Sequence, residues 1–279
     1  MQPTLSHPRT WQMPVFNTIR MLLQSAVSAC GYRIERKYDF GRYRLDVLDL
    51  VVDRLDPLRS DFFFVQVGAN NGEDHDQINA MIRRYNWRGI LLEPQPDVFA
   101  DLVRNYAGYD RLIFENAALG YSDGEQEFWT VPGQHGLGSF DKGVLRRSGF
   151  HDSETKQLLV KTVSAQTLLA KHAVGHIDLL QVDAEGFDFE VIKMFLAAGS
   201  LPTVINYEHL HLSDTNRRSC VEWLGGLGYK MLQAGPERID TVAYRSAPAD
   251  PQPACDEPNK FATLHNFLFN QRGPSLTAK

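Results

Sequence analysis

The sequence predicts an α/β fold in which a mostly parallel sheet carries helices on both faces. From Asp61 onward, short apolar segments alternate with segments of helical periodicity. The apolar segments, such as FFFVQVG and IDLLQVD, have a composition typical of strands buried on both faces. Because parallel strands need a crossover connection, usually a helix, the alternation indicates strands that run in the same direction. Ligands of such sheets bind at the carboxyl ends of the strands.

The first 60 residues are expected to form a helical cap on this sheet. Met13–Cys30 and Arg42–Leu55 both repeat apolar residues at three- and four-residue spacing, and Pro57 ends the second segment. The last residues of Met13–Cys30 weakly resemble a lipoprotein cleavage box. Arg20 and Gln24 interrupt its apolar stretch, however, which favours a packing helix over a signal segment or a helix on a membrane surface.

Residues 61–246 are expected to form the main domain, followed by a tail at 247–279. The expected strands of the main domain are Phe62–Gly68, Gly89–Glu93, Arg111–Ala117, Ile177–Asp183 and Thr203–Glu208. Its expected helices are Asp76–Tyr85, Pro96–Tyr106, Ser164–His172, Phe189–Ala198 and Asn216–Leu227. Further expected elements are short strands at Gly124–Val131 and Leu159–Val163, a glycine-rich loop at Gly133–Gly143, and a closing antiparallel hairpin of Tyr229–Gln233 with Thr241–Arg245. The tail is rich in Pro at first, and its later aromatic residues are expected to dock on the domain.

Composition and charge exclude several function classes. The 279 residues include 29 Lys and Arg against 34 Asp and Glu, a net charge of −5, so a nucleic-acid partner is not expected. Cys30, Cys220 and Cys255 are too widely spaced for a zinc motif and fit the reducing cytoplasm, where we expect the protein to act. No uninterrupted apolar run is long enough to predict a transmembrane helix.

The first strand leads into a turn between Gly68 and Gly72, with sequence GANNG. Glycine allows a positive φ angle and a close approach of another group to the backbone. The spacing is neither the G-x-G-x-x-G dinucleotide fingerprint nor a P-loop, both of which bind phosphates. The turn alone is a weak signal, but it fits a nucleoside ligand without phosphate groups.

Polar or small residues also follow the second and third strands. Glu93 comes about 20 residues after the glycines, where a carboxylate can accept hydrogen bonds from both hydroxyls of a ribose. Asn116 can bond to an adenine edge, and Ala117 and Ala118 leave room for a flat ring. These three tips together favour a nucleoside site, although each could be ordinary strand-end polarity.

The tips of the fourth and fifth strands are rich in groups that accept protons or bind metals. Asp183, Glu185 and Asp188 lie within six residues, and carboxylates so close repel one another unless a cation or solvent intervenes. Glu208, His209 and His211 follow the fifth strand. The cluster is expected to supply a base or to hold Mg²⁺ or Mn²⁺, for which the candidate ligands are Asp183, Glu185, Glu208 and His209.

The motifs VGANNG, LLEP, NAALG, VDAEGFD and NYEH, in this order, resemble the FkbM family of S-adenosylmethionine-dependent methyltransferases over about Asp61–Tyr244. The resemblance implies a Rossmann-like class I methyltransferase fold with seven strands, and O-methylation of a hydroxyl on a sugar, glycan or natural product. Two departures are Gln181, where many relatives carry Lys, and Asp188, where Glu is usual. They leave cofactor binding intact and weaken any transfer of substrate identity.

The same resemblance assigns roles to the strand tips. Glu93 would hold the ribose, and Asp183 would lie next to the methyl group and the acceptor. The remaining cofactor-binding residues would be Gly68, Ala69, Asn70 and Gly72 around the methionine and sulfonium, with Asn116 and Ala117 beside adenine.

A sugar hydroxyl is a poor nucleophile, so a base or a metal should remove its proton. His209 is the first candidate base, with Asp183 and Glu208 as further catalytic residues and His211 and His135 as alternates. Two other readings remain open: a non-catalytic nucleoside-binding scaffold on the same fold, and a nicotinamide-dependent oxidoreductase. The carboxylate and histidine cluster argues against the first, and the missing dinucleotide fingerprint against the second.

Overall fold

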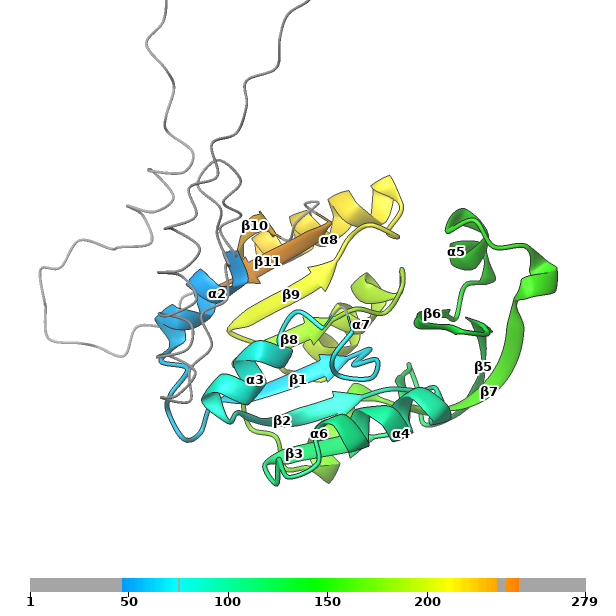
Figure 1. Ribbon diagram of the computed structural model, residues 1–279. Helices are drawn as coiled ribbons and strands as arrows, with labels where there is room; N and C mark the ends of the chain where they lie inside the picture. The colour runs from blue at the N-terminus through cyan, green and yellow to red at the C-terminus, as the bar shows by residue number, and fades with distance from the viewer. Residues whose placement is uncertain (1–46, 75, 235–238, 246–279) are drawn as a thin grey trace, which may run out of the picture.

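The computed structural model of the chain describes residues 47–74, 76–234 and 239–245 (Figure 1). The expected helix Met13–Cys30 and the aromatic tail lie outside the described residues. The expected helix Arg42–Leu55 is described from residue 47 onward, as α2 (Val47–Val52) and a 3₁₀ turn (Asp53–Leu55).

A seven-stranded sheet forms the centre of the molecule, in the order β10-β11-β9-β8-β1-β2-β3. The strands are β1 (Phe63–Val67), β2 (Arg88–Leu92), β3 (Leu112–Glu115), β8 (Leu179–Val182), β9 (Val204–Glu208), β10 (Lys230–Ala234) and β11 (Asp240–Tyr244). The first five strands run parallel to one another, whereas β11 pairs antiparallel with both β9 and β10. The predicted mostly parallel sheet and its closing hairpin are confirmed. The strand order reverses between β1 and β8, which is where a sheet of this kind opens a crevice for ligands.

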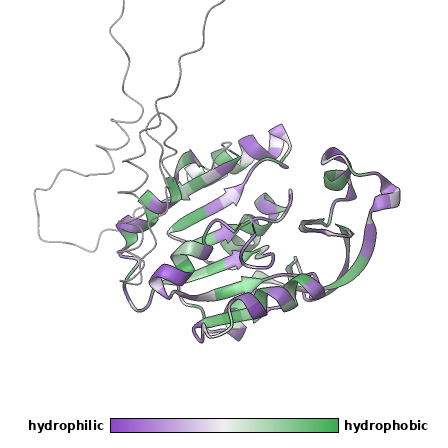
Figure 2. Cartoon of the chain, in the orientation of Figure 1, coloured by the Kyte–Doolittle hydropathy of each residue, from purple (hydrophilic) through white to green (hydrophobic). Residues whose placement is uncertain are grey.

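Helices cover both faces of the sheet and complete two hydrophobic cores. One face of the sheet carries α2, α3 (Asn79–Tyr85) and α4 (Pro96–Asn105). The other face carries α6 (Ala165–Lys171), α7 (Asp188–Ala197) and α8 (Asp214–Gly226). Side chains alternate along β1, so that Phe64 faces the first core while Val65 and Val67 face the second. Figure 2 shows the strands as hydrophobic along most of their length, with β9 becoming hydrophilic toward its arrowhead.

A second sheet of four strands, in the order β4-β7-β5-β6, stands apart from the central one. Its strands are β4 (Ala118–Leu119), β5 (Gly124–Val131), β6 (Gln134–Ser139) and β7 (Lys156–Val163), and it carries α5 (Lys142–Arg147) and a 3₁₀ turn (Asp152–Glu154). We call residues 124–163 the arm. Figure 1 shows β5, β6, β7 and α5 beyond the carboxyl ends of the parallel strands. The expectation of a loop over Gly133–Gly143 is wrong, because β6 forms there by pairing with β5.

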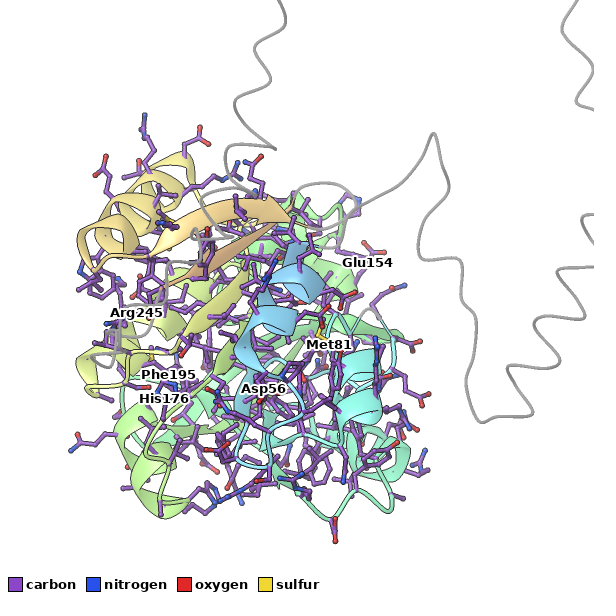
Figure 3. All side chains as sticks on the ribbon, turned by 90° about the vertical axis from the view of Figure 1, so that its left-hand side faces the viewer. Asp56, Met81, Glu154, His176, Phe195 and Arg245 are labelled. Atoms are coloured by element: carbon purple, nitrogen blue, oxygen red, sulfur yellow. The ribbon has the colours of Figure 1, made fainter. Side chains whose placement is uncertain are left out.

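The amino-terminal ends of the strands face away from the arm. Figure 3 views this end, with Asp56, His176 and Arg245 labelled. There α2 packs on the sheet through Leu48 and Val51, in contact with β9, β10 and β11. The division into residues 1–60, 61–246 and 247–279 stays a prediction. Within the described residues, no helix is long and apolar enough to cross a membrane.

Candidate active site

The tips of three parallel strands, β2, β1 and β8, are joined by backbone hydrogen bonds. The N–H groups of Gly68 and Ala69 donate to the carbonyl of Leu92 at 3.1 and 2.9 Å, and the N–H of Asp183 donates to the carbonyl of Val67 at 2.9 Å. A cavity of about 740 Å³ opens beside these tips. It is lined by the ends of β1, β2, β8 and β9 and by β6 of the arm. The convergence expected at the carboxyl ends of the strands is therefore present.

Gly68 lies where the β1 and β8 tips come closest. Its φ angle is +79°, and a Cβ atom built on it would lie 1.8 Å from the carbonyl oxygen of Asp183. Glycine is required on both counts, since other residues rarely adopt this φ and have no space here. Ala69 and Asn70 follow along the cavity wall.

Glu93 is a buried carboxylate that the backbone holds in place. Its Oε2 accepts a hydrogen bond from the N–H of Asn70 at 3.0 Å, and its Oε1 accepts one from the N–H of Gln95 at 2.9 Å. The side chain lines the cavity, and burial raises its pKa to about 7 against the lowering effect of the two N–H groups. A carboxylate with fixed orientation in a cavity wall can bind a pair of hydroxyl groups.

Two of the expected cofactor residues, Gly72 and Asn116, support the cavity wall from behind. A Cβ atom at Gly72 would lie 2.5 Å from the Tyr106 ring, so this glycine allows the turn to pack against α4. The Asn116 amide nitrogen donates to the carbonyl of Glu93 at 2.9 Å. Ala117 lines the cavity, whereas neither Gly72 nor Asn116 does. Their contacts are therefore with the residues that shape the cavity.

An acidic cluster occupies the part of the cavity wall formed by β8 and β9. Asp183, Glu185 and Glu208 line it, and His211 Nε2 lies 3.2 Å from Glu185 Oε2 and 3.9 Å from Glu208 Oε2. Burial and the neighbouring carboxylates raise the pKa of Asp183 to about 8 and the pKa values of Glu185 and Glu208 to about 9. Burial, with a smaller effect of Arg147, lowers the pKa of the His211 imidazole.

Asp188, the last carboxylate of this motif, stabilises the loop instead of joining the cluster. It is fully buried, and its two oxygens accept hydrogen bonds from the N–H groups of Ala184 and Gly186 at 3.2 and 3.1 Å. The loop between them holds Glu185 at a φ of +48°. Asp188 thus fixes the conformation from which the Glu185 side chain reaches the cavity wall.

His209, the first candidate base, lies away from the cavity. Its ring is buried, with Nδ1 2.9 Å from Thr241 Oγ1, and its carbonyl accepts a hydrogen bond from Arg217. The structure therefore brings His211, rather than His209, next to Glu185 and Glu208. The His135 side chain is not among those described.

The arm closes the cavity on the side opposite the strand tips. Ser139 Oγ donates to the carbonyl of Glu185 at 2.9 Å, and the Phe140 ring lies 5.2 Å from the rings of both Phe128 and Phe187. These contacts join β6 to the acidic loop. The strand structure of this part of the cavity wall was not predicted, because a glycine-rich segment shows no apolar alternation.

Sequence reasoning also missed a row of buried amides, two of which, Gln66 and Gln181, line the cavity. Gln66, Gln181 and Asn206 stand in register across β1, β8 and β9. The Asn206 amide donates to Gln181 Oε1 at 2.8 Å and to Gln77 Oε1 at 2.5 Å. A signal was available, since each amide is a polar residue just before the last residue or two of an otherwise apolar strand.

The family of the chain follows from a comparison with protein-family models. Residues 66–231, more than half of the chain, match the model described as the methyltransferase FkbM domain. The chain belongs to the FkbM methyltransferase family. The matched segment begins in β1 and ends in β10, so it spans the central sheet, the arm and the cavity.

Solved structures of methyltransferases resemble this FkbM chain at low sequence identity. An FkbM methyltransferase from Methylobacillus flagellatus KT is 15% identical with a TM-score of 0.41, and the match covers 66% of this chain and 43% of that one. An O-methyltransferase from Bacillus cereus in complex with SAH is 12% identical, with 85% and 93% covered and a TM-score of 0.39. An SAH-bound methyltransferase from Podospora anserina is 13% identical, with 87% and 100% covered and a TM-score of 0.39. The chain thus spans less than half the length of the M. flagellatus protein. No curated protein matches it.

Proposed function

We propose that the protein is an S-adenosylmethionine-dependent O-methyltransferase acting on a hydroxyl of a sugar, glycan or natural product. The observation that carries the proposal is one cavity with Glu93 in one part of its wall and the Asp183 cluster in another. The family supports the choice of cofactor, and so do the SAH-bound methyltransferases that resemble the chain. The reducing cytoplasm, expected from the cysteines, is the proposed location.

The cavity wall fits the cofactor at two points. The fixed Glu93 carboxylate would accept hydrogen bonds from the ribose hydroxyls. Gly68 lines the cavity without a side chain, so its backbone could lie close to the methionine part. Ala117 would border the adenine, and Asn116 and Gly72 would hold these contacts in place.

When bound, S-adenosylmethionine supplies a methyl group on a positively charged sulfur. The protein must then align the acceptor oxygen with the methyl–sulfur bond, which can contribute roughly 7–11 kcal/mol. Asp183 and Glu208 are two of the carboxylates in the cavity wall that could receive the hydroxyl proton. His209 would act as a positioning residue, through its contact with Thr241 behind the β9 tip.

A methyl-transfer screen tests the proposal. Purified protein, S-adenosylmethionine and panels of sugar and polyketide hydroxyls are incubated, and methylated products are measured by mass spectrometry. We expect transfer to at least one hydroxyl class and a large loss of rate in Asp183→Asn. Binding of the cofactor without transfer to any panel would favour a nucleoside-binding scaffold, and binding of NAD instead would favour an oxidoreductase.

A further inference from the structure

We propose that Glu185, Glu208 and His211 bind one divalent metal cation in the acceptor part of the cavity, an inference that rests on the proposed methyl-transfer function. One ligand atom from each residue lies within 4.8 Å of the other two. Atoms that share a metal ion at bond lengths of about 2.0–2.6 Å lie roughly 3–5 Å apart. The three side chains are therefore spaced closely enough to coordinate one ion.

Two carboxylate oxygens in this cluster lack the donors that buried oxygens normally have. Glu185 Oε2 and Glu208 Oε2 are both shielded from solvent and accept no hydrogen bond from the described residues. His211 Nε2 is 3.2 Å from Glu185 Oε2, but without the alignment that a hydrogen bond needs. An unsatisfied buried carboxylate oxygen costs free energy, which a cation bound between the two would offset.

Among the described residues, no lysine or arginine side chain neutralises the two glutamates in place of a metal ion. Neither Glu185 nor Glu208 forms an ion pair with a Lys or Arg among them. Arg147, which lowers the pKa of His211, pairs instead with Asp141 at 3.3 Å. Glu185 and Glu208 line the cavity together with Asp183, so an ion between them would have coordination positions open toward the acceptor.

The donor set favours one kind of metal. Two carboxylates and one imidazole combine the oxygen ligands preferred by Mg²⁺ and Mn²⁺ with a nitrogen ligand that suits transition metals. Mn²⁺ accepts both, so it is the best match and a convenient probe. This ligand set differs from the one expected from sequence, since His211 takes the place of His209 and Asp183 lies outside the group of three.

Electron paramagnetic resonance with Mn²⁺ tests the site. The full chain is treated with EDTA, exchanged into metal-free buffer and titrated with Mn²⁺, whose free-ion signal disappears on binding. We expect one site per chain, at least tenfold weaker binding in Glu208→Gln and His211→Ala, and a ¹⁴N coupling from imidazole that is lost only in His211→Ala. Glu222→Gln, an exposed carboxylate on α8, is the matched control and should bind as the wild type does.

Calorimetry with S-adenosylhomocysteine on the same samples separates the two proposals, and thermal melting confirms that each variant is folded. Mn²⁺ binding that is absent, or equal in all variants, alongside normal cofactor binding would overturn the metal site alone. Absence of both ligands would overturn the proposed function as well. If one variant is unfolded, the other variant and the ¹⁴N coupling of the wild type still test the inference. Absence of that coupling in the wild type would contradict it.

Discussion

Glu93 has a buried carboxylate whose orientation two backbone N–H groups already determine. A Glu93→Gln variant keeps the shape and loses the charge that ribose hydroxyls would bind. Hydrogen bonds to charged groups contribute about 1.5–3 kcal/mol, so the affinity for S-adenosylhomocysteine should fall about tenfold or more. Calorimetry measures this, with the exposed Glu127→Gln as control. Unchanged affinity in Glu93→Gln would place the ribose elsewhere.

The same residue gives a pH dependence whose sign can be worked out. Burial raises the pKa of free Glu93 to about 7, and hydroxyl donors would favour its ionised form and lower that pKa in the complex. The affinity for S-adenosylhomocysteine should therefore be highest above about pH 7 and decrease as the pH falls through that value. Asp183, with a pKa of about 8, titrates nearby. The pH effect of Glu93 is the difference between wild type and Glu93→Gln, and identical profiles would refute it.

Gly68 and Gly108 form a matched pair for the close approach of β1 and β8. Both have a positive φ, +79° and +93°, which costs another residue about 1–3 kcal/mol. Only Gly68→Ala also places a Cβ atom against the Asp183 carbonyl, whereas nothing lies within 4 Å at Gly108. Urea denaturation should show Gly68→Ala less stable than Gly108→Ala by about 2 kcal/mol, with cofactor binding lost. Equal free energies of unfolding in the two variants would mean that the ends of β1 and β8 can separate at little cost in free energy.

At the scale of elements, the arm depends on the aromatic contacts of Phe140. Its ring pairs with Phe128 and Phe187 contribute about 0.5–1.5 kcal/mol each beyond buried area. Phe140→Ala should therefore release the arm locally, with faster proteolytic cleavage between residues 133 and 155 and a higher KM for the acceptor. Leu159→Ala on the exposed side of the same arm is the control. Equal cleavage rates in the two variants would contradict this role.

The strands and helices that pack on both faces of the central sheet could be predicted, because their apolar residues repeat with a clear period. Thus Ile177–Asp183 was expected where β8 covers Leu179–Val182. The arm could not be predicted in the same way. The sequence QHGLGS of β6 has no apolar alternation, and it becomes a strand only through pairing with β5. Such pairing partners are not visible in a local pattern.

The sequence was sufficient to predict which strand ends form the site, but not where each side chain lies. Topology alone brings Glu93, Asp183 and Glu208 to one edge of the sheet. Beyond the end of β9 the period of two is lost, so the sequence could not show that His209 turns toward Thr241 while His211 reaches Glu185. The contact of Asn116 with the Glu93 carbonyl was not predictable for a similar reason, since it depends on how two loops meet.

For the molecule as a whole, the cavity lies between the central sheet and the arm, so a ligand that fills it should stabilise the folded chain. A ligand at 100 times its Kd adds about 2.7 kcal/mol, which for a chain of this size raises the Tm by roughly 5–10 °C. Differential scanning calorimetry should show this rise with S-adenosylhomocysteine and none with NAD. A rise with NAD alone would support the oxidoreductase alternative instead.

The most direct test is a crystal structure of the protein with S-adenosylhomocysteine. We expect the ribose hydroxyls within hydrogen-bond distance of both Glu93 oxygens, the methionine part along Gly68, and the sulfur facing Asp183. A ligand bound elsewhere, or a ribose without contact to Glu93, would contradict the assignment of this cavity as the methyl-transfer site.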